Sequence, residues 1–273
     1  MTRHRLPERI VCLSTETVEV LYALGESDRI AGISGFTTRP ARARKEKPKV
    51  SGFSSAQIER ILAVQPDLVL AFSDMQADIC RDLVRAGVAV HVFNQRDLDG
   101  ILTMIATVGA LVGAHTRAAA LIAQLEARLD AARQAGEARI ARLGRRPRVY
   151  FEEWDSPMIC GIRWVSELIA LAGGEDVFAE RAMAPDASAR VIADGAEVIA
   201  RAPDLILASW CGKKLRPERI AERPGWSALA AVAEGRIHEI KSALILSPGL
   251  VAIEAGLPAI AAALDTLAPP SGG

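Results

Sequence analysis

Hydrophobic positions in the first hundred residues form short runs that alternate with stretches of helical period. The short runs contain β-branched residues and are typical of buried strands, at residues 9–14, 30–34, 68–72 and 88–93. The helical stretches lie at residues 17–24, 57–64 and 77–86, and Gly25 and Gly87 end the first and last of them. Strands and helices that alternate at this spacing predict a parallel α/β sheet.

The pattern changes after residue 98, where the apolar positions keep a helical period as far as Leu143, with a break at Gly113. From residue 116 onward this helix would extend roughly 40 Å at 1.5 Å per residue, which is more than one small sheet needs. Strand–helix alternation then restarts at residue 148. The pattern predicts an N-terminal α/β lobe at 1–98, a helical connector at 99–145 and a C-terminal α/β lobe at 146–273.

The second lobe repeats the pattern of the first. Residues 58–72 read IERILAVQPDLVLAF and residues 196–209 read AEVIARAPDLILAS, so Pro66 aligns with Pro203 without a gap. An internal duplication of this kind implies two lobes of like topology. Ligands of such sheets bind beyond the carboxyl ends of the strands. We therefore expect two Rossmann-like lobes with mostly parallel sheets, joined by the long α-helix, and a ligand cleft between them.

Three segments carry a resemblance to a known family: RIVCLSTETVEVLYALG from Arg9, DRIAGIS from Asp28, and KVSGFSSAQIERILAVQPDLVLA from Lys49. With the long helix and the second ARAPDLILAS, they are similar to the class III substrate-binding proteins of ABC importers for cobalamin, haem and ferric siderophores. The resemblance covers nearly all of residues 8–265 and is closest to the cobalamin-binding branch. It implies two lobes joined by a rigid helix, a ligand between them and a small closure.

The charges of the chain balance, with 33 Lys and Arg against 33 Asp and Glu. A general nucleic-acid binder would carry a basic excess, so the composition argues against that class. No window approaches about 18 apolar residues without a charge, so no membrane-spanning helix is expected. The balance also fits a bulky, largely neutral ligand better than a highly charged one.

Only twelve residues are aromatic, and half of them end predicted strands or lie in the segments after them. These six are expected to wall the ligand cleft: Phe36, Phe53, Phe72, Trp154, Trp164 and Trp210. In the cobalamin-binding branch, aromatic residues occupy the loops that match the three Phe. The alternative is that each ring fills a local core position, which is the role we expect for the other six.

The segment SWCGKK follows a predicted strand and brings a thiol and two cations to its end. Lys213 is a candidate to bind a carboxylate, amide or phosphate of the ligand. The thiols of Cys160 and Cys211 are weak candidates to contact a soft metal centre in the ligand, and ordinary thiols are the alternative. The four His are scattered, so no zinc or manganese site is expected.

Three carboxylates, Glu152, Glu153 and Asp155, cluster after a predicted strand. They could act as an acid and a base or accept hydrogen bonds from ligand amides, and the lack of a partner base favours binding. The sequence also lacks a GxSxG nucleophile elbow and a GxxxxGK[ST] phosphate loop. We therefore expect a binding protein and not an enzyme, with no intrinsic cofactor.

Relatives in this family dock on the permease through one acidic residue in each lobe. The resemblance assigns the first contact to Glu59, for which a solvated helix charge is the alternative. In the second lobe the homologous position is Ala196, with Glu197 one residue away and Asp194 nearby. One residue turns a helical side chain by about 100°, so the resemblance leaves Glu197 open as the second contact.

The leading hypothesis is a monomeric binding protein that captures a corrinoid such as cobalamin for the permease and ATPase of an ABC importer. A ferric siderophore or haem is the first alternative ligand, for which Arg163, Lys213 and Lys241 would supply positive charge. A cytoplasmic sensor, carrier or processing protein for corrinoids is the second, because the N-terminus shows no apolar stretch typical of a secretory leader. The resemblance implies a periplasmic location instead.

Overall fold

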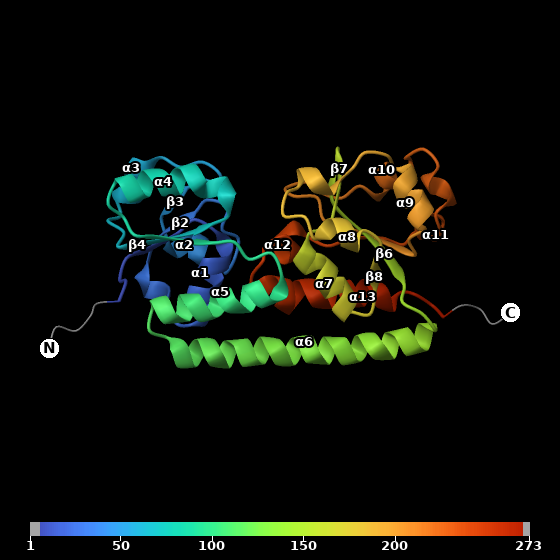
Figure 1. The fold of residues 1–273 in the computed structure, drawn as a ribbon, viewed down its shortest axis with the longest axis horizontal. Coiled ribbons are helices and arrows are strands. Elements are labelled where there is room, and N and C mark those ends of the chain that lie inside the picture. Colours follow the sequence, from blue (N-terminus) through green and yellow to red (C-terminus); the bar gives the residue numbers. More distant parts are fainter. Residues whose placement is uncertain (1–5, 270–273) are drawn as a thin grey trace. The chain divides into compact units, whose positions relative to one another are not determined.

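The computed structural model describes residues 6–269, and contacts between Cα atoms divide the chain into two units. The first unit is Met1–Gln124 and the second is Leu125–Gly273. The boundary lies inside one continuous helix, α6 (His115–Leu143), which closely matches the long helix predicted from the sequence (Figure 1). Among the described residues, every helix is too short or too polar to cross a lipid bilayer.

The first unit contains a five-stranded sheet in the order β3-β2-β1-β4-β5, and each neighbouring pair is parallel. Its strands are β1 (Ile10–Cys12), β2 (Ile30–Ser34), β3 (Lys49–Ser51), β4 (Leu68–Phe72) and β5 (Val90–Phe93). Its helices before α6 are α1 (Thr15–Ala23), α2 (Ala43–Glu46), α3 (Ile58–Leu62), α4 (Ala77–Arg85) and α5 (Leu98–Leu111), with 3-10 turns at Ser27–Arg29 and Asp74–Gln76. The sequence pattern does not reveal β3, because only Val50 of its three residues is buried.

The second unit contains a sheet in the order β11-β10-β6-β7-β9, and β8 pairs with the start of β6. Its strands are β6 (Arg148–Asp155), β7 (Met158–Cys160), β8 (Glu175–Asp176), β9 (Val191–Ile192), β10 (Leu205–Ala208) and β11 (Ile237–Glu239). Its helices after α6 are α7 (Arg163–Leu171), α8 (Ala179–Ala182), α9 (Ala196–Arg201), α10 (Pro217–Ala221), α11 (Ala230–Ala233), α12 (Ser242–Ile245) and α13 (Leu257–Asp265), with 3-10 turns at Ser188–Arg190 and Trp226–Ala228 and a π-helical turn at Ala252–Gly256.

The predicted parallel pairing is confirmed for β6 with β8 and β10, and for β10 with β11. The exception is β7, which pairs antiparallel with β6 through Asp155 and Met158. The sequence predicts a strand only over residues 148–151 and a loop after it. The polar residues of the segment EEWD conceal the second half of β6 and therefore the hairpin that follows.

The duplication predicted from the sequence is present in the structure. Ile10 of β1 lies opposite Leu68 of β4, and Val149 of β6 lies opposite Leu205 of β10. The next strand, β5 or β11, then pairs in parallel with β4 or β10. In both units, therefore, the strand after the Pro-Asp dipeptide lies between the first and the last strand of the unit's sheet.

The aspartate of each Pro-Asp dipeptide binds the backbone at the start of the first strand of its unit. The Asp67 carboxylate accepts hydrogen bonds from the N–H groups of Glu8 and Arg9, at 2.7 and 3.0 Å. The Asp204 carboxylate accepts one from the N–H of Arg148 at 2.7 Å. We call the two aspartates the aspartate clamps. They explain why the dipeptide occurs at the same place in both halves of the sequence.

Replacing Asp204 with asparagine is expected to lower the free energy of unfolding by about 2 kcal/mol at pH 7. The Arg145 guanidinium also donates to both carboxylate oxygens, at 2.6 and 2.7 Å, and these bonds lose their charge in the variant. Burial raises the pKa of Asp204, but the hydrogen bonds from Arg145 and Arg148 outweigh it and hold the pKa below its usual value.

The contribution of the Asp204 carboxylate to the free energy of unfolding is therefore fully present above the unfolded-state pKa of about 3.9. It is lost as the pH falls through the lower folded-state pKa. Urea denaturation from pH 7 to pH 3 measures this contribution, and Asp186→Asn, at an exposed carboxylate, is the control. The stability gap between wild type and Asp204→Asn should narrow below about pH 4. A gap that stays constant down to pH 3 contradicts the assigned pKa direction.

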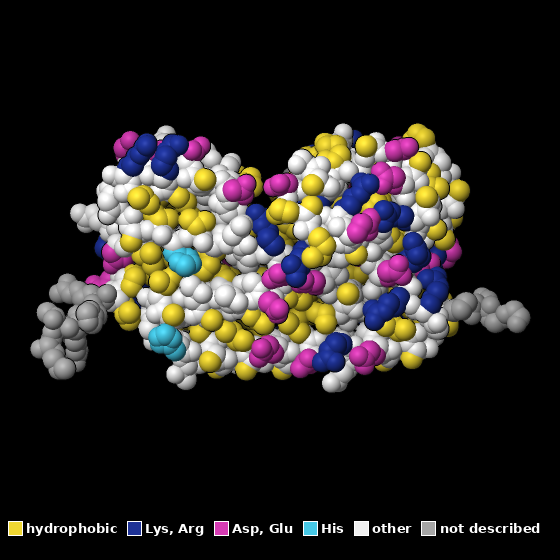
Figure 2. Space-filling view, in the orientation of Figure 1, with side chains coloured by type: hydrophobic (Ala, Val, Ile, Leu, Met, Phe, Trp, Pro, Cys, Tyr) yellow, Lys and Arg dark blue, Asp and Glu magenta, His cyan; other side chains and the backbone are white. Residues whose placement is uncertain are grey.

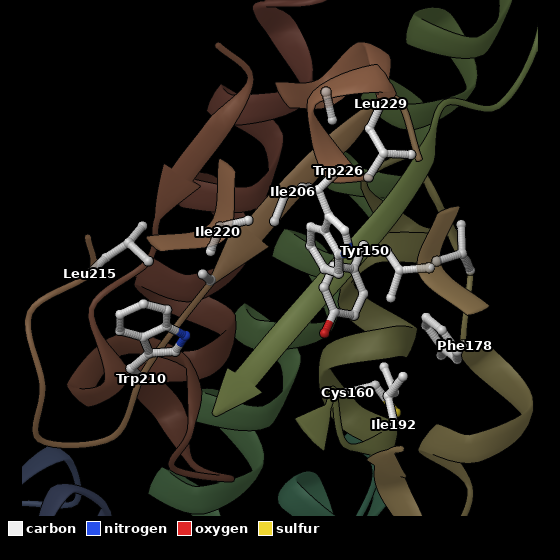
Figure 3. Packing of buried hydrophobic residues seen from close by; sticks show 14 residues of the cluster. Tyr150, Cys160, Phe178, Ile192, Ile206, Trp210, Leu215, Ile220, Trp226 and Leu229 are labelled. Carbon is white, nitrogen blue, oxygen red and sulfur yellow. The ribbon is translucent and has the colours of Figure 1, made fainter. Parts of the chain in front are cut away.

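Each unit has its own hydrophobic core. In the second unit, the rings of Tyr150, Phe178 and Trp226 lie in one buried cluster (Figure 3). The Tyr150 ring centroid is 5.6 Å from that of Phe178 and 5.9 Å from that of Trp226, in edge-to-face geometry. One cluster of buried residues in the first unit is built mainly of aliphatic side chains, among them Val11, Leu13, Ile61, Val69 and Leu83.

Candidate functional site

The first unit presents aromatic residues where its parallel strands end. Strands β2 and β3 end at Ser34 and Ser51, and the segments that follow them carry Phe36 and Phe53. Strand β4 ends at Phe72 itself. We call Phe36, Phe53 and Phe72 the aromatic edge. The Phe36 ring is 68% exposed and Phe53 is half-buried, so two of the three rings can offer apolar surface to a ligand.

The buried side-chain amide of Gln76 holds the backbone of the aromatic edge, a role that the sequence pattern does not reveal. Gln76 is fully buried. Its amide oxygen accepts a hydrogen bond from the N–H of Phe72 at 2.8 Å. Its amide nitrogen donates to the carbonyls of Leu13 at 3.1 Å and Phe53 at 2.8 Å. Gln76 therefore connects segments that follow β1 and β3 with the end of β4.

Two further side chains hold the segment that carries Phe36. The Ser34 hydroxyl donates to the Gly52 carbonyl at 3.1 Å and accepts from the N–H of Phe36 at 3.2 Å. The Arg44 guanidinium donates to the carbonyls on both sides of Phe36, each at 2.7 Å. A β-carbon at Gly52 would lie 3.9 Å from the Phe36 ring, so this ring stands directly beside the segment that leads into Phe53.

The second unit contributes Trp154, which is half-buried near the end of β6. The ammonium of Lys213 lies 3.8 Å from the centroid of the Trp154 ring and 2.9 Å from a carboxylate oxygen of Asp155. Arg219 approaches the other oxygen of this carboxylate at 3.2 Å. Burial raises the pKa of Asp155, but Lys213 and Arg219 outweigh it and lower the pKa below its usual value. The positive charge of Lys213 is therefore already paired with Asp155 within the second unit.

Three of the six predicted ligand-wall rings are buried. Trp164 is 4% exposed, and its indole N–H donates to the carbonyl of Ile245 at 2.8 Å. Trp210 is 3% exposed and belongs to the cluster in Figure 3. These two rings fill core positions, which corrects the prediction that they face a ligand. Phe72 is also buried, with the Arg96 guanidinium 5.6 Å from its ring centroid, so it is the buried member of the aromatic edge.

The most buried charge in the second unit is Glu152, which is completely enclosed. Its carboxylate accepts two hydrogen bonds from Arg223 at 2.5 and 3.0 Å, one from the Tyr150 hydroxyl at 2.9 Å and one from the indole N–H of Trp210 at 2.9 Å. Burial and the neighbouring carboxylate raise the pKa of Tyr150 well above its usual value. We call these four residues the Glu152 cluster.

The neighbouring carboxylates are paired as well. Glu153 forms an ion pair with the buried Arg190 at 2.5 Å, and Asp155 is held by Lys213. The prediction that these carboxylates bind ligand amides is therefore wrong for Glu152, whose oxygens are fully occupied. On the surface of the second unit that Figure 2 shows, side chains of both signs are interspersed as well.

The two thiols that were weak candidates for metal contact differ in accessibility. Cys160 is buried, its thiol donates to the Arg190 carbonyl at 3.3 Å, and burial raises its pKa to about 12. Cys211 is exposed, and partial desolvation together with the carboxylate of Glu153 raises its pKa. Within residues 6–269, no group of His, Cys, Asp and Glu is arranged to hold a metal ion.

A thiol reagent is expected to modify one of the four cysteines of the folded protein, at Cys211. The other three are buried, so the reagent cannot reach them readily, and burial also raises the pKa of their thiols. Titration with Ellman's reagent at pH 7 and pH 9 checks this, since the labelling of Cys211 should accelerate with pH. Cys211→Ser is the control and should leave no rapidly labelled thiol, whereas labelling of Cys160 at the same rate contradicts the structure.

The predicted docking residues lie on equivalent helices of the two units. Glu59 is exposed in the first turn of α3, and its carboxylate takes part in none of the hydrogen bonds or ion pairs found between residues 6 and 269. Glu197 lies in the first turn of α9 and is paired with Arg181. Asp194 is exposed and caps the start of α9 by accepting from the N–H of Ala196 at 2.8 Å.

Two of the three cations that could bind an anionic ligand already form ion pairs. Arg163 donates to Glu167 at 2.9 Å, and Lys213 is paired with Asp155. Lys241 precedes α12 and is exposed. In the part of the chain that the structure describes, Lys241 has no ion pair, so it is the one of these three cations that remains available for a ligand.

Comparison with known proteins finds a family whose sequence profile, described as periplasmic binding protein, matches residues 10–244. The chain is 26% identical over 206 residues to a vitamin B12-binding protein of Vibrio campbellii, which covers 74% of this chain and 70% of that protein. It is 28% identical over 177 residues to a cobalamin-binding protein of Halobacterium salinarum, and this match covers 64% of this chain and 47% of that protein.

Solved structures with the same fold include the periplasmic heme-binding protein RhuT from Roseiflexus sp. RS-1. Its TM-score is 0.78 at 25% identity, over 94% of this chain and 99% of that chain. The periplasmic vitamin B12 binding protein of Vibrio cholerae has a TM-score of 0.71 at 21% identity, over 95% and 97% of the two chains. The second likeness is one of fold alone.

Proposed function

Since this chain belongs to the periplasmic binding protein family, we propose that it captures a corrinoid such as cobalamin and delivers it to an ABC importer. The family and the relatives described above are substrate-binding proteins and not enzymes. Relatives that are named for vitamin B12 or cobalamin support a corrinoid as the ligand.

The observation that carries this proposal is the exposed ring of Phe36 beside the half-buried Phe53. A large apolar side chain that is 68% exposed at the carboxyl ends of parallel strands gains stability when a ligand covers it. A corrin macrocycle has a broad, largely apolar face that flat rings can pack against. Trp154 supplies a comparable ring in the second unit, fixed by the ammonium of Lys213.

A ferric siderophore or haem is the second candidate ligand, and one observation favours it. Lys241 is exposed and has no ion pair within residues 6–269, so it could bind a ligand carboxylate. The pairing of Arg163 and Lys213 argues against a highly charged anion, because such a ligand would have to displace Glu167 and Asp155. A largely neutral corrinoid would leave both ion pairs intact.

Delivery would place the monomeric protein in the periplasm, where it docks on the permease through the acidic residues of α3 and α9. Glu59 supports this role because its carboxylate is exposed and has no partner among the described residues. Glu197 would first have to leave Arg181, and Asp194 is the exposed alternative in the segment just before α9. Pull-down with the cognate permease would distinguish them, with Glu59→Gln, Glu197→Gln and Asp194→Asn compared in parallel.

Titration with cyanocobalamin tests the proposal, by calorimetry and by visible absorption of the corrin. We expect saturable binding of one ligand per chain. Haemin and a ferric hydroxamate, titrated under the same conditions, test the second candidate. The corrinoid assignment fails if cyanocobalamin shows no binding at about 100 μM, which corresponds to a binding free energy weaker than about −5.5 kcal/mol.

A further inference from the structure

We propose that Gln76 and Ser34 are positioning residues that hold the aromatic edge in its binding shape before the ligand arrives. This inference rests on the proposed function, in which Phe36 and Phe53 cover one face of the ligand. Neither side chain needs to touch the ligand, because Gln76 is 0% exposed and Ser34 is 1% exposed. Their role is to fix the backbone from which the rings project.

The sheet connects only two members of the aromatic edge directly. Strands β2 and β3, which lead to Phe36 and Phe53, pair with each other. Strand β1 separates them from β4, so the ladder of hydrogen bonds does not join their ends to Phe72. The amide of Gln76 crosses this gap. It reaches the backbone of Phe72, of Leu13 and of Phe53 from one buried point.

The three hydrogen bonds of Gln76 also define the orientation of its amide. The oxygen faces an N–H donor and the nitrogen faces two carbonyl acceptors. Rotating the amide by 180° would set donor against donor and acceptor against acceptor. An apolar side chain of the same size would leave two carbonyls and one N–H without their partner, so the segments would move to find new ones.

Ser34 extends the connection to the remaining ring. Its hydroxyl accepts from the N–H of Phe36 and donates to the carbonyl of Gly52, the residue before Phe53. Phe36, Ser34, Phe53, Gln76 and Phe72 are thus linked in one continuous chain of contacts. Binding of a ligand to the aromatic edge then costs little conformational entropy, because the backbone that carries the rings is already fixed.

The test compares Gln76→Met and Ser34→Ala with Gln57→Met, a matched control at an exposed glutamine that forms no side-chain cap on α3. The dissociation constant for cyanocobalamin is expected to rise roughly tenfold in each of the first two variants and to stay unchanged in the control. In the ligand-free protein, amide hydrogen exchange should accelerate at Phe72 in Gln76→Met and at Phe36 in Ser34→Ala.

The exchange measurement separates this proposal from the proposed function. If wild-type protein binds no cyanocobalamin, the ligand assignment fails, and local exchange alone decides whether the two residues position the edge. If the variants lose global stability but keep the wild-type dissociation constant and local exchange, the role is structural only and the proposal is overturned. Should Gln76→Met fail to fold, Ser34→Ala decides, because it removes one hydroxyl and leaves the amide of Gln76 intact.

Discussion

Replacing Glu152 with alanine should lower the free energy of unfolding by about 3–5 kcal/mol, the largest effect on stability that we expect in this protein. The change removes the acceptor for all four hydrogen bonds of the Glu152 cluster. Arg223, with a side chain that is 16% exposed, would then hold an unpaired charge beside the buried hydroxyl of Tyr150. Urea denaturation followed by tryptophan fluorescence measures the loss.

The matched control is Glu222→Ala, at an exposed carboxylate directly before Arg223, and it should change stability by less than about 0.5 kcal/mol. A double replacement, Glu152→Leu with Arg223→Met, should recover only part of the loss, because it removes both buried charges but leaves the Tyr150 hydroxyl and the Trp210 N–H without an acceptor. If Glu152→Ala behaves like its control, the four hydrogen bonds do not stabilise the unit and the account of this cluster is wrong.

Replacing Phe36 with alanine should weaken the binding of cyanocobalamin about 30-fold, which corresponds to about 2 kcal/mol. The ring is 68% exposed in the absence of ligand, so it contributes little to the core of its unit. Stability should therefore stay within about 0.5 kcal/mol of wild type. Calorimetry gives the dissociation constant and urea denaturation gives the stability of the same preparations.

Val84 on α4 offers the matched control for Phe36. It is an apolar side chain of the same unit with a similar exposure of 61%, and it lies on a helix and not in the aromatic edge. Val84→Ala should leave both binding and stability unchanged. Equal binding by wild type and Phe36→Ala would remove this ring from the site and leave the half-buried Phe53 and Trp154 as the remaining aromatic candidates.

The elements that depend on apolar periodicity could be predicted from the sequence. Strands β4 and β10 are buried along their whole length, so each appears as a continuous apolar run after Pro-Asp. Helix α6 is long enough for its period to be unambiguous. Hairpin β6–β7 was hidden, because the carboxylates in β6 are buried by pairing with arginines that are far away in the sequence.

The direction of a ring beyond a strand could not be predicted. Phe36 and Trp210 both lie two residues after the end of a strand, β2 and β10 respectively. One is exposed and the other is in the core. The alternation of a strand fixes the direction of a side chain only while the ladder continues, and beyond it the local turn decides. The role of Gln76 was hidden for a similar reason, since it lies in the polar segment SDMQAD.

The aspartate clamps separate what the two units share from what they do not. Asp67 and Asp204 perform the same task at the same place, so each unit anchors the start of its first strand through the same local contact. The residues at the strand ends share no such likeness, with Phe36 and Phe53 in one unit and Trp154 with Lys213 in the other. A substitution at a clamp is therefore expected to change the stability of its unit, and one at a strand end the proposed binding of the ligand.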